Sequence, residues 1–107
     1  DASVTPWAEG KSMQVWVRNG WRPIVNAAAA QLRYIGVEVL EAREKLGTLR
    51  IHAPARDGRR PKVISINYQA AQLAAETCDL CGQAGALQAN TPRRVRCRWH
   101  ADTCPQT

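Results

Sequence analysis

The feature that most constrains this chain is a set of cysteines and a histidine in its last third. Cys78 and Cys81 are separated by two residues, and Cys97 and His100 repeat that spacing further along the chain. Thiolates and an imidazole in two such pairs are typical of a tetrahedral zinc site with four protein ligands. The glycine that follows Cys81 favours the tight turn of a metal-binding knuckle. The sequence therefore predicts a structural Zn²⁺ bound by these four residues.

Two alternatives to this ligand set stay open. Cys104 lies four residues after His100 and could replace it as the fourth ligand. Disulfides are the other alternative, since four cysteines allow three connectivities, one of which joins Cys78 to Cys81 and Cys97 to Cys104. Such bridges would leave most of the chain without a cross-link, so we favour zinc. Cysteines used as metal ligands fit a reducing cytoplasm, which is the compartment that we expect.

The length of the chain indicates one small domain with a metal-bound appendage. At 107 residues, a modest core gains stability from a metal that cross-links the chain. We expect residues 1–77 to form an α+β core and residues 78–107 to form a zinc-ribbon-like module. No apolar run reaches the ~20 residues that a membrane-spanning helix needs, so we expect no association with a membrane.

Apolar spacing predicts a first helix over residues 22–35. Pro23 suits the first turn of a helix, and Gly36 is the expected stop. The residues expected on its apolar face follow three- and four-residue steps: Ile24, Ala27, Ala28, Gln31, Leu32 and Ile35. Residues 1–18 lack clear periodicity, so we expect an irregular arm there, with at most a short strand at 15–17.

A β-hairpin is predicted after the first helix. Residues 37–44 are rich in β-branched side chains at their start, and residues 48–53 alternate apolar and polar side chains around Leu49 and Ile51. Gly47 marks the turn between them. A helix over residues 38–46 is the alternative, because several glutamates favour it.

A basic loop and a second helix complete the predicted core. Residues 54–62 form the polar loop, and residues 63–77 form the helix, which Ser65 or Asn67 could cap. This helix delivers Cys78 to the metal site. The order of helix, hairpin, helix and zinc module predicts an α+β fold.

Three parts of the chain resemble a family of small uncharacterised proteins found in bacterial genomes, phages and other mobile elements. The parts are residues 20–23, residues 41–50, and the Cys-x₂-Cys-Gly and Cys-x₂-His pairs of residues 78–100. Members of the family have an aromatic residue where this chain has Leu46. The resemblance implies a zinc site and a mobile-element context, and it implies no activity.

Positive charge is concentrated beside the predicted metal site. The formal net charge is +6, and most of the cations are arginines, whose planar guanidinium suits phosphate recognition. One cluster occupies residues 56–62. The second contains the residues that we predict to bind nucleic acid: Arg93, Arg94, Arg96, Arg98 and Trp99.

The spacing within the second cluster favours a basic stripe. In a strand, Arg94, Arg96 and Arg98 would share one face, whereas Val95 and Cys97 would point inward. The arginines would contact phosphates and Trp99 would stack on a base. We therefore predict a nucleic-acid-binding protein stabilised by zinc.

An adaptor or inhibitor that binds another protein, encoded on a mobile element, is the alternative function. Tryptophan is enriched in binding hot spots, and Trp7, Trp16 and Trp21 are the candidate anchors. Trp21 at the start of the first helix is expected to pack in the core, so Trp7 is the better candidate for exposure.

The chain offers little for catalysis, and we expect a protein that is not an enzyme. His52 and His100 are its two histidines, and neither belongs to the His-x-Glu motif of zinc deaminases. A catalytic zinc needs three protein ligands and an open position, whereas four ligands are predicted here. No nucleotide-binding glycine pattern is present.

Overall fold

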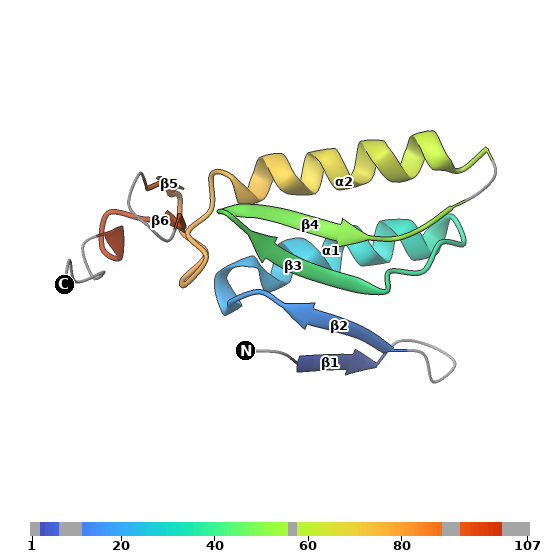
Figure 1. The fold of residues 1–107 in the computed structure, drawn as a ribbon, viewed down its shortest axis with the longest axis horizontal. Helices are drawn as coiled ribbons and strands as arrows, with labels where there is room; N and C mark the ends of the chain where they lie inside the picture. The colour runs from blue at the N-terminus through green and yellow to red at the C-terminus, as the bar shows by residue number, and fades with distance from the viewer. Residues whose placement is uncertain (1–2, 7–11, 56–57, 89–92, 102–107) are drawn as a thin grey trace.

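A computed structural model of the chain describes residues 3–6, 12–55, 58–88 and 93–101. Its elements in chain order are β1 (Ser3–Pro6), β2 (Ser12–Trp16), the 3₁₀ helix η2 (Asn19–Trp21), α1 (Arg22–Tyr34), β3 (Glu41–Lys45), β4 (Thr48–His52), α2 (Arg60–Ala74), β5 (Ala86–Leu87) and β6 (Val95–Arg96). The predicted α+β class is confirmed, since two α-helices accompany small β-sheets in the described part of the chain (Figure 1).

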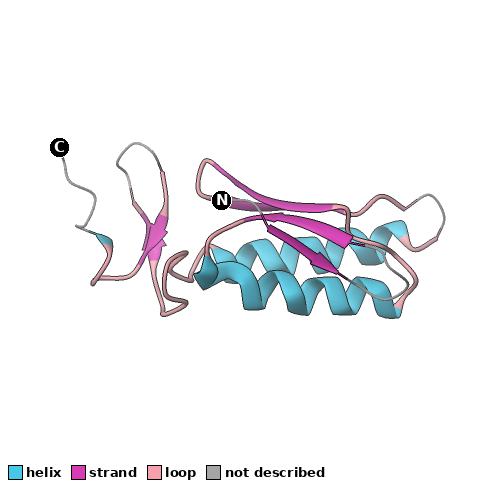
Figure 2. Cartoon of the chain, turned by 90° about the horizontal axis from the view of Figure 1, so that it is seen from below, coloured by secondary structure: helices cyan, strands magenta, loops and turns pink. Residues whose placement is uncertain are grey.

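The larger sheet has the strand order β1-β2-β3-β4. The two outer pairs are antiparallel, whereas β2 and β3 run parallel and are joined through α1. A parallel pair needs such a crossover, because its strands start at the same end of the sheet. Both α-helices cover one face of this sheet, as Figure 2 shows, and no helix among the described residues lies on the opposite face.

Alternating side chains assign the two faces of the sheet. In and just after β2, Met13, Val15 and Val17 are buried, whereas Gln14 and Trp16 are exposed. Successive residues of a strand point to opposite faces, so the buried set lies under the helices. The helices and the connecting segments complete this core with Trp21, Val25, Ala28, Ala29, Leu32, Val37, Val39, Val63, Ala70 and Ala74.

The expectation of an irregular arm over residues 1–18 is wrong. The structure has two strands there, β1 and β2, and the expected short strand at 15–17 overlaps the end of β2. The partner that fixes β2 is β3, with Val15 opposite Ala42. Since the parallel partner is distant in the sequence, the local pattern of residues 1–18 alone gives a weak signal.

The first helix agrees with its prediction in extent and differs in its buried face. It spans Arg22–Tyr34, and Gly36 follows it with a φ of 82°. Its buried residues are Val25, Ala28, Ala29 and Leu32, whereas Ala27 and Gln31, both expected on the apolar face, are exposed. An alanine-rich helix offers several faces of similar hydrophobicity, so the position of the sheet decides which one is buried.

The predicted hairpin is present, and the alternative helix over residues 38–46 is wrong. The first strand starts at Glu41 rather than at Val37, and Val37 and Val39 are buried in the segment before it. The turn consists of Leu46 with a φ of 54° and Gly47 with a φ of 82°. Two positive φ angles match a type I′ turn, whose twist suits a two-residue hairpin.

The second helix begins earlier than the sequence predicts. It starts at Arg60, inside the expected loop, with Pro61 in its first turn. Residue Arg59 is the N-cap, so Ser65 and Asn67 are not the caps. The Asn67 side-chain amide instead donates to the Ile51 carbonyl of β4 at 3.2 Å and ties the helix to the sheet. Neither described α-helix is both long and apolar enough to cross a membrane.

Candidate metal centre

The segment after α2 forms a tight knuckle around Cys78. The Cys78 backbone amide donates to the Gln83 carbonyl at 2.7 Å, and the Cys78 carbonyl accepts from the Gly82 amide at 3.0 Å. Gly82 has a φ of 83°, a conformation that glycine adopts at little cost. The glycine after the second cysteine therefore has the role that the sequence predicts.

A short hairpin brings the second pair of ligands to the knuckle. Strands β5 and β6 pair with Leu87 opposite Val95, and Cys97 follows β6 directly. The chain then turns, with the His100 amide donating to the Cys97 carbonyl at 3.0 Å. The described residues 78–88 and 93–101 are called the Cys/His module below.

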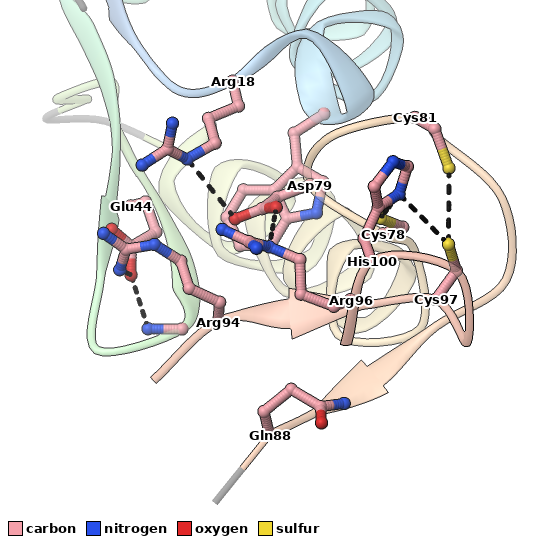
Figure 3. Close-up of polar contacts among 12 residues, drawn as sticks. Arg18, Glu44, Cys78, Asp79, Cys81, Gln88, Arg94, Arg96, Cys97 and His100 are labelled. Carbon is pink, nitrogen blue, oxygen red and sulfur yellow. Dashed lines mark hydrogen bonds and ion pairs between the residues drawn. The ribbon is translucent and has the colours of Figure 1, made fainter. Parts of the chain in front are cut away.

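The four predicted ligands meet at one point in space (Figure 3). Nδ1 of His100 lies 3.2 Å from Sγ of Cys97 and 3.5 Å from Sγ of Cys78, and Sγ of Cys81 lies 3.6 Å from Sγ of Cys97. All four ligand atoms lie within 4.8 Å of one another. Cys78, Cys81, Cys97 and His100 could therefore hold a metal ion.

Backbone amides stabilise a negative charge on the Cys78 sulfur. Burial alone would raise the pKa of its thiol, but hydrogen bonds from the backbone amides of Cys81, Leu80 and Cys97, together with the His100 side chain, outweigh it. The result is a pKa of about 6 for Cys78. A thiolate is the form that binds a metal, so the knuckle favours the metal-binding state of this residue.

Cys81 is affected in the opposite direction. The Gln83 amide lowers the pKa of its thiol, but desolvation and the neighbouring Cys97 and Cys78 sulfurs raise it more, and the pKa lies above its usual value. Thiols this close together do not readily ionise at the same time, because the resulting thiolate charges repel each other. A bound cation would remove that repulsion.

The two alternatives in the ligand set fare differently. The structure has Cys78, Cys81 and Cys97 as free thiols, so the disulfide between Cys78 and Cys81 is not formed. Cys104 lies outside the described residues.

One residue of the site gave no signal in the sequence. Asp79, between the first two ligands, is 2% exposed. Its carboxylate accepts from Nε of Arg96 at 2.7 Å and lies 3.8 Å from Nε of Arg18, which follows β2 (Figure 3). An aspartate within a Cys-x₂-Cys spacer is normally read as a solvated turn residue. Its burial depends on the arginines that the fold places around it.

The Cys/His module is anchored on the core by hydrogen bonds from η2. The Trp21 indole donates to the Thr77 carbonyl at 2.8 Å, and the Gly20 amide donates to the Asp79 carbonyl at 2.9 Å. A Cβ at Gly20 would lie 2.2 Å from the Cys78 carbonyl oxygen. The close approach of the knuckle to η2 therefore requires glycine at this position. Trp21 is fully buried, so its expected place in the core is confirmed.

The predicted basic stripe divides into paired and exposed members. Val95 and Cys97 are buried, and the arginines between and beside them point the other way. The guanidinium of Arg94 pairs with Glu44 of β3 at 3.2 Å, and that of Arg96 pairs with Asp79. The Arg94 pair holds the module against β3, whereas the Arg96 pair lies within the module.

The remaining members of the stripe reach the surface. Arg93, Arg98 and Trp99 are exposed, with 74% of Trp99 accessible, and the Arg98 guanidinium lies 5.2 Å from the centre of the Trp99 ring. A hollow of about 400 Å³ beside the Arg98–Trp99 pair is also lined by Gln83 and Ala84.

The other candidates from the sequence occupy different surfaces. His52 is exposed on β4, far along the sheet from the thiols. In the first basic cluster, Arg59 donates to the Gly36 carbonyl at 2.9 Å, and Arg56 lies outside the described residues. Trp7 also lies outside them, whereas Trp16 is 43% exposed.

Comparison of the chain with protein-family models, with curated proteins and with solved structures found no match.

Proposed function

We propose that Cys78, Cys81, Cys97 and His100 bind one structural Zn²⁺. Three sulfurs and one nitrogen form a donor set that Zn²⁺ favours. A tetrahedron with Zn–S bonds of about 2.3 Å has sulfur–sulfur edges of about 3.8 Å, and the measured Cys81–Cys97 separation of 3.6 Å is close to it. Four protein ligands leave no open position for a substrate, so the metal stabilises the fold and Cys104 is not needed as a ligand.

Native mass spectrometry of the protein, purified under reducing conditions without added metal, tests this proposal. The expected spectrum shows one zinc per chain, less the protons that the ligands release. A metal-free chain whose mass is lowered by the protons of one or two disulfides would contradict the proposal, and would also contradict a reducing compartment.

We further propose that the protein acts by binding nucleic acid and not by catalysis. The observation that carries this proposal is the exposed pair of Arg98 and Trp99 on the Cys/His module, with Arg93 exposed on the same module. Exposed cations next to an aromatic ring suit a nucleic acid, since the cations neutralise phosphates and the ring stacks on a base. The net charge of +6 supports the same partner.

The ion pairs of the stripe refine this proposal. Arg94 and Arg96 are partly buried and paired with carboxylates, Arg94 with Glu44 of the core and Arg96 with Asp79 of the module. The phosphate contacts are therefore assigned to Arg93 and Arg98, and base stacking to Trp99.

Fluorescence anisotropy with labelled single- and double-stranded oligonucleotides tests nucleic-acid binding by the metal-loaded chain. We expect affinity to fall steeply with added salt, and to fall about tenfold in Arg98→Gln/Trp99→Ala. Lys62→Gln, which removes one exposed charge on α2, is the matched control for charge and is expected to bind like the wild type. The proposal is abandoned if the wild type binds none of the oligonucleotides at low salt.

An adaptor that binds another protein, in keeping with the mobile-element context that the resemblance implies, is the second candidate. The observation that favours it is an open groove of about 510 Å³ between α1 and α2, where Tyr34 is 90% exposed. Ile64 and Tyr68 are also more than half exposed on α2. Partner binding that is insensitive to salt and weakened by Tyr34→Ala would favour this candidate over nucleic acid.

A further inference from the structure

The larger sheet has a second face, on the side opposite the two α-helices. The residues of β2, β3 and β4 that point to it alternate with the buried set and are called the open sheet face: Gln14, Trp16, Glu41, Arg43, Lys45, Thr48, Arg50 and His52. All of them are exposed except Glu41, which is half-buried. Figure 2 shows that none of the described helices covers this side of the sheet.

Strand register places three of these side chains in one row. Trp16 of β2 is the partner of Arg43 of β3, and Arg43 is in turn the partner of Arg50 of β4. Side chains directly opposite one another on a sheet face lie about 5 Å apart at Cβ. A tryptophan ring therefore lies at one end of a line that continues with two guanidinium groups.

The open sheet face carries positive charge. Its strands contribute the cations Arg43, Lys45 and Arg50 and the single carboxylate of Glu41, which pairs with Arg43 at 2.6 Å. Arg50 and Lys45 form no ion pair with any residue that the structure describes. Glu41 compensates the charge of Arg43, but the Arg43 side chain stays 52% exposed in this pair, whereas that of Arg94 is 23% exposed in its pair with Glu44. Arg43 is therefore still open to a phosphate.

Two further features suit a single-stranded nucleic acid. Trp16 is 43% exposed, large enough a fraction for one base to stack on its ring. It also borders a hollow of about 180 Å³, which leaves space beside the ring, although the cations Arg18 and Arg94 that line it are paired with the carboxylates of Asp79 and Glu44. Unpaired bases can lie flat on such a sheet, as they do on the sheets of RNA-binding domains, whereas bases stacked in a duplex cannot.

We propose that the open sheet face binds single-stranded nucleic acid, with a base stacked on Trp16 and phosphates bound by Arg43, Arg50 and Lys45. The inference rests on the proposed function, and it moves the principal contact from the Cys/His module to the sheet.

Anisotropy with a labelled oligothymidylate and an oligouridylate, using the metal-loaded full chain, tests the inference. Arg43→Gln/Arg50→Gln is expected to weaken binding at least about tenfold and to reduce the salt slope by about 1.4, because two phosphate contacts are lost. Trp16→Leu, which keeps an apolar side chain without an aromatic ring, is expected to weaken binding about fivefold or more. A duplex of the same length is expected to bind less tightly.

Arg60→Gln/Lys62→Gln is the matched control, because it removes the same charge from exposed positions of α2. It is expected to retain wild-type affinity within about twofold, since screened charges on the helical side contribute little. Thermal melts of each variant check that the fold is retained. Because Arg43 and Arg50 are exposed, their variant keeps the inference testable even if Trp16→Leu unfolds.

The variants separate the inference from the proposed function. Wild-type affinity in Arg43→Gln/Arg50→Gln, combined with loss in Arg98→Gln/Trp99→Ala, overturns the sheet and leaves the Cys/His module as the binding site. Loss in the sheet variant alone supports the inference and removes the assignment to Arg98 and Trp99. A wild type that binds no oligonucleotide overturns both, and tighter binding of the duplex overturns the single-stranded partner.

Discussion

At the scale of single residues, Cys81 is the most informative of the four proposed zinc ligands to change. It is exposed, unlike the buried Cys78 and Cys97, so its replacement removes few packing contacts. Structural zinc contributes about 10 kcal/mol or more to the folding of small metal-bound modules. Cys81→Ser is therefore expected to lower Tm by at least about 10 °C, and a chelator is expected to lower the wild-type Tm as much. Differential scanning calorimetry measures both.

Cys104→Ser is the matched control for this ligand. The same chemical change at a cysteine outside the proposed site is expected to leave Tm unchanged. Equal destabilisation by Cys104→Ser and Cys81→Ser would place Cys104 in the ligand set, and an unchanged melt in Cys81→Ser would count against a structural metal.

Gly20 is a second position where a single substitution is expected to change stability, because an added Cβ atom has no room there. A Cβ there would lie 2.2 Å from the Cys78 carbonyl oxygen and 2.8 Å from the Gly82 amide nitrogen. Both neighbours are backbone atoms of the knuckle, so they move only if the module shifts. Gly20→Ala is expected to destabilise the protein by about 1–3 kcal/mol, as overpacking does, in urea unfolding experiments.

Gly58→Ala provides the comparison for Gly20, because nothing lies within 4 Å of a Cβ at Gly58. Its free energy of unfolding is expected to stay within about 0.5 kcal/mol of the wild type, like that of other surface substitutions. If the two alanine variants were equally stable, the close approach between η2 and the knuckle would be disproved.

At the scale of elements, the turn between β3 and β4 contains a residue that suits it poorly. Leu46 has a φ of 54°, and 71% of the residue is exposed. A left-handed conformation costs a side chain of this kind about 1–2 kcal/mol, whereas asparagine tolerates it. Leu46→Asn also creates the Asn-Gly pair that type I′ turns prefer. We expect it to stabilise the protein by about 0.5–1 kcal/mol, measured by chemical denaturation.

Leu40→Asn tests whether this gain comes from the backbone. Leu40 is also exposed, at 47%, and does not have a positive φ. Its replacement is expected to give no stabilisation, since the surface loses a leucine without relief of strain. A similar gain in both variants would assign the effect to surface hydrophobicity and not to the turn.

At the scale of the whole molecule, the Cys/His module and the α+β core share one hydrophobic interior. Val95 of β6 is fully buried in the core cluster, and Trp21 of the core hydrogen-bonds to Thr77. Two parts joined in this way are expected to unfold together. Far-UV circular dichroism, which follows the helices, and tryptophan fluorescence are expected to give coincident melts of the metal-loaded protein.

Metal removal is expected to shift both melts together to a lower temperature. Helices that melt at the same temperature with and without the metal would show that the module is an independent appendage of the core.

Local sequence signals were sufficient wherever a structure is set by neighbours in the chain. The spacing of Cys78, Cys81, Cys97 and His100 predicted that these four side chains converge, because each pair belongs to one tight turn. Gly36 and Gly47 marked the end of a helix and the turn of a hairpin for the same reason. The short strand expected at residues 15–17 overlaps the end of β2, but Val15, Trp16 and Val17 are all apolar, so the sequence did not show which of them is exposed.

Tertiary contacts decided the features that depend on distant residues. The parallel pairing of β2 with β3 joins segments on either side of α1, so no local pattern fixes it. The sequence placed Arg94 and Arg96 in a predicted phosphate-binding stripe. In the fold, Glu44 pairs with Arg94 and the buried Asp79 pairs with Arg96, so their charges are compensated within the protein. The sequence alone determined which side chains could ligate a metal, since that depends on short-range geometry. The fold determined which cations remain exposed, because an ion pair forms only where packing brings its partners together.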